Sequence, residues 1–174
     1  MRRPLRIVLI TSCCFIAVIT AASLAGIRIN TTSSYPRGIY RMTNDPIEKG
    51  SLVIFCPPDN AAIRQAYERG YIGAGFCPGG YEYMIKKIMA AKNDHVQISV
   101  VGVSVNGALL PNSKPMDADL EGRQLLHINT DIATLDDHSV LLMSDYNPKS
   151  FDARYFGLVD KSQIISTINP LWIW

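Results

Sequence analysis

The sequence has few charged residues, few cysteines and no metal-binding pattern. Lys, Arg, Asp and Glu make up 18% of its 174 residues, and the net charge is only +2. The basic residues are scattered, whereas a nucleic-acid surface needs them clustered, so we expect no nucleic-acid partner. The four cysteines form no Cys-x-x-Cys pair, which leaves a zinc or redox motif unsupported. No internal repeat or low-complexity tract is present either.

One long uncharged stretch lies at the N-terminus. Residues 1–6 carry three arginines, and the next 21 residues, Ile7 to Ile27, carry no charge. A transmembrane helix needs about 20 apolar residues, and arginines before such a run place its N-terminus in the cytoplasm. We therefore predict that residues 1–28 are a cytoplasmic tip and membrane anchor. Residues 29–174 then form one domain across the bilayer, long enough for a single core.

Two other interpretations of this stretch stay open. It can be a cleaved signal peptide, with Ser23 and Ala25 as the small residues before the cut. A lipoprotein signal around Cys13 is weaker, because the apolar stretch before that cysteine is too short. All three interpretations export the domain. In an exported domain Cys56 and Cys77 can form a disulfide, although two buried free thiols are an equal alternative.

The remaining pattern favours strands. Apolar runs, or apolar residues alternating with polar ones, predict strands, and the dipeptide Asn106-Gly107 between two apolar runs predicts a hairpin. A short helix is expected where Asp59 or Asn60 can cap the start and Gly70 can end it. The fold class is thus mainly β, an antiparallel coiled sheet or barrel with one or two short helices. The expected elements are strands at 52–56, 81–91, 96–100, 103–110, 140–143 and 163–168, a helix at 61–69 and a long loop at 111–137.

Residues 30–40, directly after the uncharged stretch, are the first segment that can carry chemistry. Pro36 and Gly38 constrain a turn here. Such a turn can expose a serine hydroxyl and aim backbone N–H groups at one point, as acyl transfer requires. Alone this is weak evidence, because a Ser/Thr-rich stretch after a membrane anchor is more often a linker.

Two adjacent lysines, Lys86 and Lys87, interrupt an apolar stretch. Neighbours in a strand face opposite sides, so one lysine can reach solvent while the other points inward. Burial lowers the pKa of a lysine, and the neutral amine can act as a general base on a serine hydroxyl. The alternative is an edge strand whose lysines discourage aggregation.

A late polar cluster forms the third segment, at residues 144–157. Asp152 and Arg154 are two residues apart, on the same face if extended, and can pair; Ser150 is two residues before Asp152. Such a cluster can support an active site or can be a structural turn with one salt bridge.

Taken in this order, the three segments resemble the signal peptidase I superfamily. Its members have a membrane anchor, a nucleophilic serine, a lysine base and a late Asp/Ser/Asp/Arg box. Lys86-Lys87-Ile88 is similar to the family's Lys-Arg-Val/Ile segment, whose first lysine is the base, and Val105-Asn106-Gly107 is similar to its hairpin. The late box matches the family's spacing at five positions, Asp145, Ser150, Asp152, Arg154 and Gly157.

The nucleophile region departs from ordinary leader peptidases, in which proline follows the serine by three residues. Here Ser34-Tyr35-Pro36 has a spacing of two, and with the preceding Asn30-Thr31-Thr32 it is similar to TraF-type conjugative-transfer peptidases. The Cys-Pro pairs at Cys56 and Cys77 add to this likeness. Ser33 would restore the three-residue spacing, but the TraF form selects Ser34.

The resemblance implies a Ser34–Lys86 dyad that works without metal or cofactor. The Ser34 N–H, with Thr32 as a second donor, would stabilise the oxyanion, and Ser150 would hydrogen-bond and orient Lys86. Asp152 paired with Arg154 would hold the box in shape, with Asp145 as a further supporting residue. His95, His127 and His138 are expected to be surface residues.

The resemblance also implies a setting and a substrate. The chain would be a single-pass protein of the bacterial inner membrane, with its catalytic domain in the periplasm. It would cleave an exported precursor bound as an added β-strand, such as a pilin, and some TraF relatives also join pilin ends into a ring. The rival interpretation is a non-catalytic, membrane-tethered assembly factor, for which Ser34 and Lys86 would lie more than about 5 Å apart with Lys86 exposed. A housekeeping leader peptidase is disfavoured by the Ser-x-Pro spacing, and a self-cleaving repressor by the membrane segment.

Overall fold

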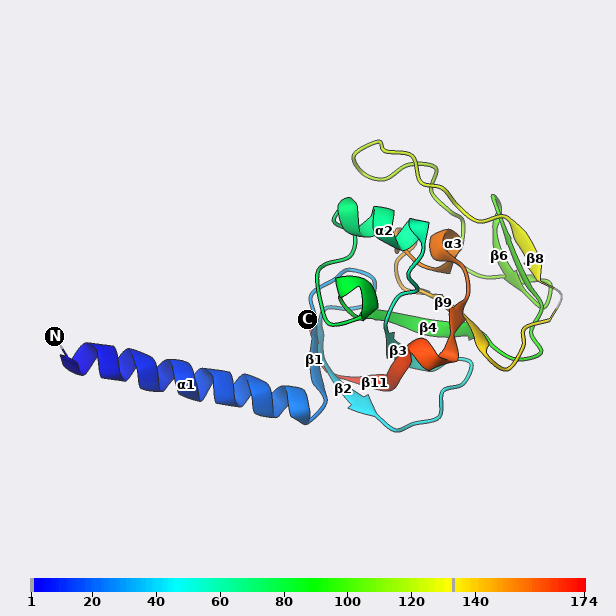
Figure 1. Cartoon of the computed structure of the whole chain (residues 1–174). Coiled ribbons are helices and arrows are strands. Elements are labelled where there is room, and N and C mark those ends of the chain that lie inside the picture. Colours follow the sequence, from blue (N-terminus) through cyan, green and yellow to red (C-terminus); the bar gives the residue numbers. More distant parts are fainter. Residues whose placement is uncertain (1, 133) are drawn as a thin grey trace.

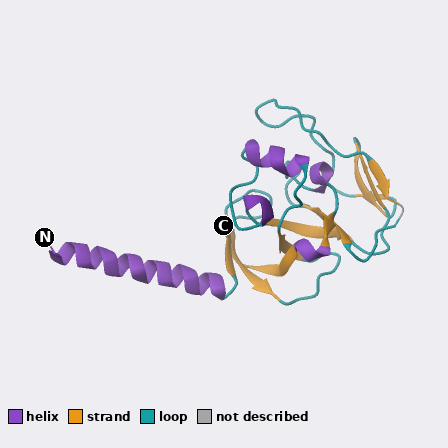
Figure 2. Ribbon diagram, in the orientation of Figure 1, coloured by secondary structure: helices purple, strands orange, loops and turns teal. Residues whose placement is uncertain are grey.

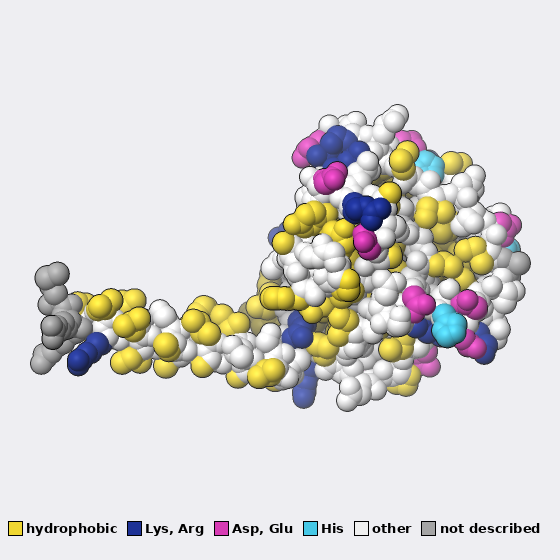
Figure 3. All heavy atoms as spheres, in the orientation of Figure 1, with side chains coloured by type: hydrophobic (Ala, Val, Ile, Leu, Met, Phe, Trp, Pro, Cys, Tyr) yellow, Lys and Arg dark blue, Asp and Glu magenta, His cyan; other side chains and the backbone are white. Residues whose placement is uncertain are grey.

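A long N-terminal helix, α1 (Arg2–Leu24), projects from a β-rich domain (Figure 1). The computed structural model describes residues 2–132 and 134–174, with side chains from Pro4 onward. Residues Pro4–Leu24 are long enough and apolar enough to cross a membrane, and none of this span is buried in the domain. Apolar side chains run along the described part of the helix, from Pro4 onward (Figure 3). The helix is therefore a candidate for a membrane span or a signal sequence.

Gly26 is suited to end this helix. Its φ of +80° is a left-handed conformation that glycine adopts without steric cost, and its N–H donates to the Ser23 carbonyl. The predicted orientation of the helix depends on the N-terminal arginines. Met1 and the side chains of Arg2 and Arg3 lie outside the described residues, so the orientation stays a prediction.

Among the described residues the domain has two antiparallel sheets, and the predicted mainly-β fold class is confirmed. The larger sheet curls into a half-barrel, with helices over one side of it and the smaller sheet at the end remote from α1 (Figures 1 and 2). Its strands, in spatial order, are β1 (Ile27–Asn30), β2 (Gly38–Thr43), β11 (Ile164–Ile173), β3 (Leu52–Phe55), β4 (Met84–Ala90), β9 (Ser139–Met143) and β10 (Val159–Asp160). The smaller sheet has the order β7 (Ala108–Leu109), β6 (Gly102–Val105), β5 (Val96–Ser99) and β8 (Thr130–Ile132).

The core is built from the large sheet, the buried residues of the smaller sheet and two short helices, α2 (Ala61–Glu68) and α3 (Ala153–Phe156). Ile63 and Ala66 form the buried face of α2. Asn60 caps that helix, since its Oδ1 accepts from the Ile63 N–H at 3.0 Å, and its Nδ2 donates to the Phe156 carbonyl of α3 at 3.1 Å. One side chain thus begins a helix and joins it to its neighbour.

The predicted hairpin is present between β6 and β7. Asn106 and Gly107 have φ values of +53° and +79°, as a tight two-residue turn requires. A disulfide joins Cys56, just after β3, to Cys77, which precedes the short 3₁₀ turn η1 (Pro78–Gly80). The two cysteines are therefore paired in the structure rather than free.

The structure differs from the local sequence reasoning at three points. The last strand does not end before Pro170 but runs to Ile173, because a register shift between Pro170 and Trp172 accommodates a residue that lacks an N–H. Strands β1 and β2 were not predicted, because β1 pairs with β2 across the loop between them and β2 pairs with β11 near the C-terminus. Asp152 and Arg154 do not share an extended segment, because Asp152 is the N-cap of α3.

Candidate active site

The loop that carries Ser34 connects β1 to β2 and is organised by one buried side chain. Asn30, the last residue of β1, is only 4% exposed. Its Nδ2 donates to the carbonyls of Thr32, Tyr35 and Pro36 at 3.3, 3.1 and 3.0 Å. Its Oδ1 accepts from the Thr32 N–H at 3.1 Å and the Thr32 hydroxyl at 2.8 Å. The loop is thus folded around the Asn30 amide.

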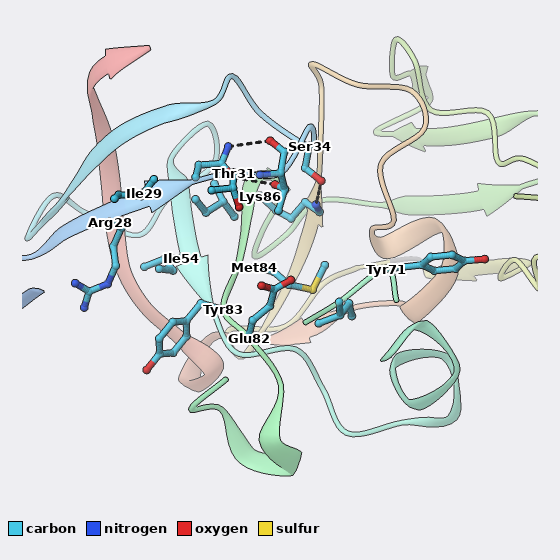
Figure 4. Close-up of a pocket in the computed structure, with 14 residues that line it drawn as sticks. Arg28, Ile29, Thr31, Ser34, Ile54, Tyr71, Glu82, Tyr83, Met84 and Lys86 are labelled. Carbon is cyan, nitrogen blue, oxygen red and sulfur yellow. Dashed lines mark hydrogen bonds between the residues drawn. The ribbon is translucent and has the colours of Figure 1, made fainter. Parts of the chain in front are cut away.

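This loop places Ser34 against Lys86 of β4 (Figure 4). The Lys86 Nζ lies 3.0 Å from the Ser34 Oγ and donates to it. The Ser150 hydroxyl also donates to the Ser34 Oγ, at 3.2 Å, and the Ser144 hydroxyl donates to the Ser34 carbonyl at 2.6 Å. Residues far apart in sequence therefore converge on one hydroxyl. The expected contact of Ser150 with Lys86 is instead a contact with Ser34.

Lys86 and Lys87 face opposite sides of β4, as strand geometry requires. Lys86 is 1% exposed, whereas the Lys87 side chain is 36% exposed and forms an ion pair with Asp145. Burial lowers the pKa of Lys86 to about 8, an effect that Asp152 opposes and Arg154 reinforces. At pH 8 about half of the Lys86 side chains are neutral, and a neutral amine has a lone pair that can accept the Ser34 proton.

Asp152 and Arg154 form a fully buried ion pair behind this dyad. Both side chains are 0% exposed, and two parallel bonds of 2.8 Å join the guanidinium to the carboxylate. Asp152 also accepts from the Ser144 N–H at 3.2 Å. Such a buried pair requires good geometry and satisfied hydrogen bonds to offset its loss of hydration. The other guanidinium N–H groups donate to the carbonyls of Asn112, Lys114, Pro148 and Ser150.

Asp145 links the serine loop to the sheet. It accepts from the Tyr35 hydroxyl at 2.7 Å and from Lys87 Nζ at 2.8 Å. Burial acts to raise the pKa of Asp145, but the bonds from Lys87 and Tyr35 hold that pKa below its usual value. Burial, and then the bond to Asp145, raise the pKa of Tyr35, so this hydroxyl stays protonated and donates. Asp145 thereby links Tyr35, the residue next to Ser34, to Lys87 of β4.

The two groups expected to bind an oxyanion, the Ser34 N–H and the Thr32 hydroxyl, differ in availability. Within the described residues no acceptor is found for the Ser34 N–H, which leaves it free to bind an oxyanion. The Thr32 hydroxyl already donates to Asn30 Oδ1, so it serves an oxyanion only after rotating. Ser33 contributes its carbonyl, which accepts from Asn147 Nδ2 at 2.9 Å. Of the two candidate serines, Ser34 is the one whose hydroxyl contacts Lys86.

Two cavities meet at Ser34. The first, of about 220 Å³, lies between the end of β1 and the segment 82–86 (Figure 4). The second, of about 420 Å³, is bounded by segments 69–71, 116–125 and 147–151 and by Tyr155. Thr32, Ser34, Tyr71 and Met84 line both cavities. Ser34 therefore lies where the two cavities adjoin.

The histidines lie elsewhere. His95 is exposed and pairs with Asp131 at 2.5 Å, and His138 is exposed as well. His127 is half-buried rather than at the surface, and its Nδ1 has no partner among the described residues. None of the three is among the residues that line the two cavities. In the described part of the chain no three His, Cys, Asp or Glu side chains are grouped closely enough to hold a metal.

Sequence reasoning assigned no role to Asn30, Ser144 or Tyr35. Asn30 stands two residues before Thr32, and this spacing is typical of a local turn in which the side chain bonds the backbone two residues on. Its bonds to Tyr35 and Pro36 have no such local signal. Ser144 and Tyr35 act across more than 100 residues of sequence, which only the folded chain brings together.

The sequence is similar to a known protein family and to individual named proteins. Residues 2–173 match the model of the family described as signal peptidase, peptidase S26. The chain is 53% identical over 154 residues to a plasmid transfer protein TraF from Escherichia coli, a match covering 88% of this chain and 87% of that protein. It is 37% identical over 152 residues to a probable conjugal transfer protein TraF from Sinorhizobium fredii, covering 86% of this chain and 79% of the relative.

Among solved structures, a signal peptidase I from Enterococcus faecalis matches with a TM-score of 0.39 and 15% identity, over 72% of this chain and 98% of that one. The family match extends over nearly all of this chain, and the relatives are matched over most of their own length. The chain therefore belongs to the signal peptidase family, peptidase S26.

Proposed function

We propose that this protein is a membrane-anchored serine endopeptidase with Ser34 as nucleophile and Lys86 as general base. One observation carries the proposal. The Lys86 amine is almost completely buried, has a pKa of about 8 and lies 3.0 Å from the Ser34 hydroxyl oxygen. A non-catalytic assembly factor has no need for a buried lysine held against a serine, and burying a cation without function is costly.

The chemistry follows from these contacts. Neutral Lys86 accepts the Ser34 proton while Oγ attacks the peptide carbonyl, and the Ser34 N–H stabilises the oxyanion. Lys86, now an ammonium, gives the proton to the departing amine. Ser150 donates to the Ser34 Oγ and so favours the orientation in which the Ser34 proton points to Lys86. The acyl-enzyme is then released by an amine or a water.

The substrate is inferred from relatives. TraF proteins at 53% and 37% identity bear the names plasmid transfer and conjugal transfer protein, which supports a role in conjugation. We infer a pilin-type precursor, exported across the membrane and cut beside Ser34. Release of the acyl group to the amine at the precursor's own N-terminus would close a ring, whereas release to water would give a linear product.

The location is inferred from two features. Helix α1 has the length and composition of a membrane span, and the Cys56–Cys77 disulfide fits an oxidising compartment. We propose that α1 is retained as a single anchor in the bacterial inner membrane. Its N-terminus would lie in the cytoplasm and residues 29–174 would lie in the periplasm.

Purified full-length protein in detergent, incubated with candidate pilin precursors and analysed by mass spectrometry, tests the proposal. Ser34→Ala and Lys86→Ala should each lower the rate of processing by at least about 10³-fold, because the two groups act as one unit. Ser33→Ala should retain it, since within the described residues Ser33 bonds through its carbonyl and not through its hydroxyl. The ring and the linear product differ by the mass of one water. Undiminished processing by Ser34→Ala or Lys86→Ala would remove the dyad.

A further inference from the structure

The larger cavity beside Ser34 has a wall that lies outside both sheets. Residues 116–125, here called the flap, fold back on themselves through a bridge between Ala118 and Gln124. Asp119 holds this turn, because its carboxylate accepts from the N–H groups of Glu121 and Arg123. The flap is therefore a built wall of the cavity and not an open loop.

The flap also contacts Tyr71, which lies on the opposite wall of the cavity. The Tyr71 hydroxyl donates a short hydrogen bond to Asp119, and the Arg123 guanidinium lies 5.5 Å from the centre of the Tyr71 ring. Burial acts to raise the pKa of Asp119, but the bonds from Tyr71 and Arg123 hold that pKa well below its usual value. Asp119 is thus an ionised carboxylate whose acceptor capacity is used within the wall.

The charges that line this cavity do not cancel. Its carboxylates are Asp119 and Glu121, and both pair with Arg123, at 2.6 and 3.0 Å. Two further cations line the cavity, Arg69 and Lys149. Arg69 donates to the neutral carbonyl of Gln124 at 2.7 Å. Within the described residues neither Arg69 nor Lys149 has a carboxylate within ion-pair distance, so two cations stand without a counter-ion.

These two cations come from different walls. Arg69 follows α2 and lies next to the flap, while Lys149 directly precedes Ser150, whose hydroxyl is 3.2 Å from the Ser34 Oγ. Apolar side chains complete the lining, Met84, Met116, Leu125 and Phe151 among them. The cavity thus offers an apolar surface, two cations outside any ion pair and, with Arg123, Asp119 and Glu121 included, a lining of net positive charge.

We propose that this cavity binds the precursor on one side of the cut bond through a carboxylate placed within a few residues of that bond, with Lys149 and Arg69 as its partners. The inference rests on the peptidase function proposed above and extends it to sequence preference. The carboxylate can belong to an Asp or Glu side chain or to the C-terminus of the precursor, since both present the same group to a cation.

The test uses full-length protein in detergent and quenched fluorescent peptides that contain the precursor's cleavage sequence. Glu, Gln or Lys is placed in turn at each of three positions on either side of the bond. Every peptide is made with a free and with an amidated C-terminus. The variants are Lys149→Ala, Lys149→Glu and Arg69→Ala. Lys161→Ala is the matched control, because that lysine lies outside both cavities.

On one side of the bond only, a carboxylate should raise kcat/KM about 3- to 10-fold over its neutral counterpart, an effect that shrinks at high salt. Lys149→Ala and Arg69→Ala should each reduce this preference, and Lys149→Glu should reverse it in favour of Lys peptides. Lys161→Ala should leave it unchanged. A gain with Glu identifies a side chain as the source, and a gain seen only with the free C-terminus identifies the terminal carboxylate.

Failure of the carboxylate preference and failure of the proposed peptidase function give different results. If the wild-type protein cuts Glu, Gln and Lys peptides at equal rates, and equally with free and amidated ends, the inference is overturned while the peptidase function stands. If it cuts none of the peptides or precursors, the proposed function falls and the inference falls with it. A preference that Lys149→Glu fails to alter would also overturn the role of that lysine.

Discussion

Replacing Lys86 by methionine is expected to stabilise the protein while abolishing its activity. The side chain is 1% exposed, and burial lowers its pKa from the ordinary 10.5 to about 8. Between these two pH values the unfolded chain binds a proton that the folded chain does not. The wild-type protein therefore gains stability as the pH rises from about 8 to about 10.5, and below pH 8 it carries the full cost of the buried charge.

The size of the stabilisation follows from the difference between the pKa of Lys86 in the unfolded and in the folded chain. The gap between 10.5 and about 8 corresponds to about 3 kcal/mol. Methionine has a similar length, cannot ionise and loses the hydrogen bond to Ser34, worth about 1 kcal/mol. Lys86→Met should thus raise the free energy of unfolding by about 2 kcal/mol at pH 7, and the gain should vanish by about pH 10.5.

Urea unfolding of the full-length protein in detergent, without reductant and followed by tryptophan fluorescence at pH 7 and pH 10, measures this. Lys92→Met is the control, because Lys92 is exposed and pairs with Asp137 at the surface. It should change the stability by no more than about 0.5 kcal/mol at either pH. An equal gain from Lys86→Met at both pH values would refute the reasoning, because it would trace the gain to apolar packing and not to a buried charge.

Three further predictions concern the dyad, its loop and the disulfide. The value of kcat/KM should rise tenfold per pH unit and level off near pH 8, because only neutral Lys86 accepts the Ser34 proton; a flat profile from pH 6 to 9 contradicts this. Asn30→Ala should lower kcat on the order of 10²-fold with a smaller change in KM, because the loop loses five hydrogen bonds. Asn129→Ala, at an exposed position, is the control. Equal kinetics in the two variants would contradict the positioning role of Asn30. Replacing Cys56 and Cys77 by serine should lower the free energy of unfolding by about 3 kcal/mol, as expected for a separation of 21 residues; chemical denaturation measures it, and an unchanged midpoint would contradict it.

Local features of the sequence predicted much of the fold. Alternating apolar residues predicted β5, and a continuous apolar run predicted β9; both patterns are properties of neighbouring residues, so both strands were found near their true bounds. Asn106-Gly107 specifies its turn by backbone conformation alone. Pro170 misled the prediction, because proline usually ends a strand and the bulge that tolerates it here depends on pairing with β2.

The candidate site, too, was predicted from the sequence in part and missed in part. Adjacent lysines in a strand predict that one of them is inward, and the family resemblance selected Lys86. The partner of Ser150 was wrong because it depends on where the serine loop lies relative to residues 144–154. The role of Ser144 was missed for the same reason, since its hydroxyl donates from the late box to the Ser34 carbonyl. The role of Asn30 was missed because its bonds to Tyr35 and Pro36 depend on how the loop folds back on that side chain.

The sequence by itself determined the residue types of the proposed reaction, the strand periodicity, the apolar N-terminal helix and the membership of the family. These depend on chemistry and spacing along the chain. Only the tertiary structure decided that Lys86 loses contact with water, that its amine meets the Ser34 hydroxyl and that two cations line the cavity beside them. The physical reason is that burial and electrostatic environment are set by side chains from distant segments, which the antiparallel sheet and the buried Asp152–Arg154 pair bring together.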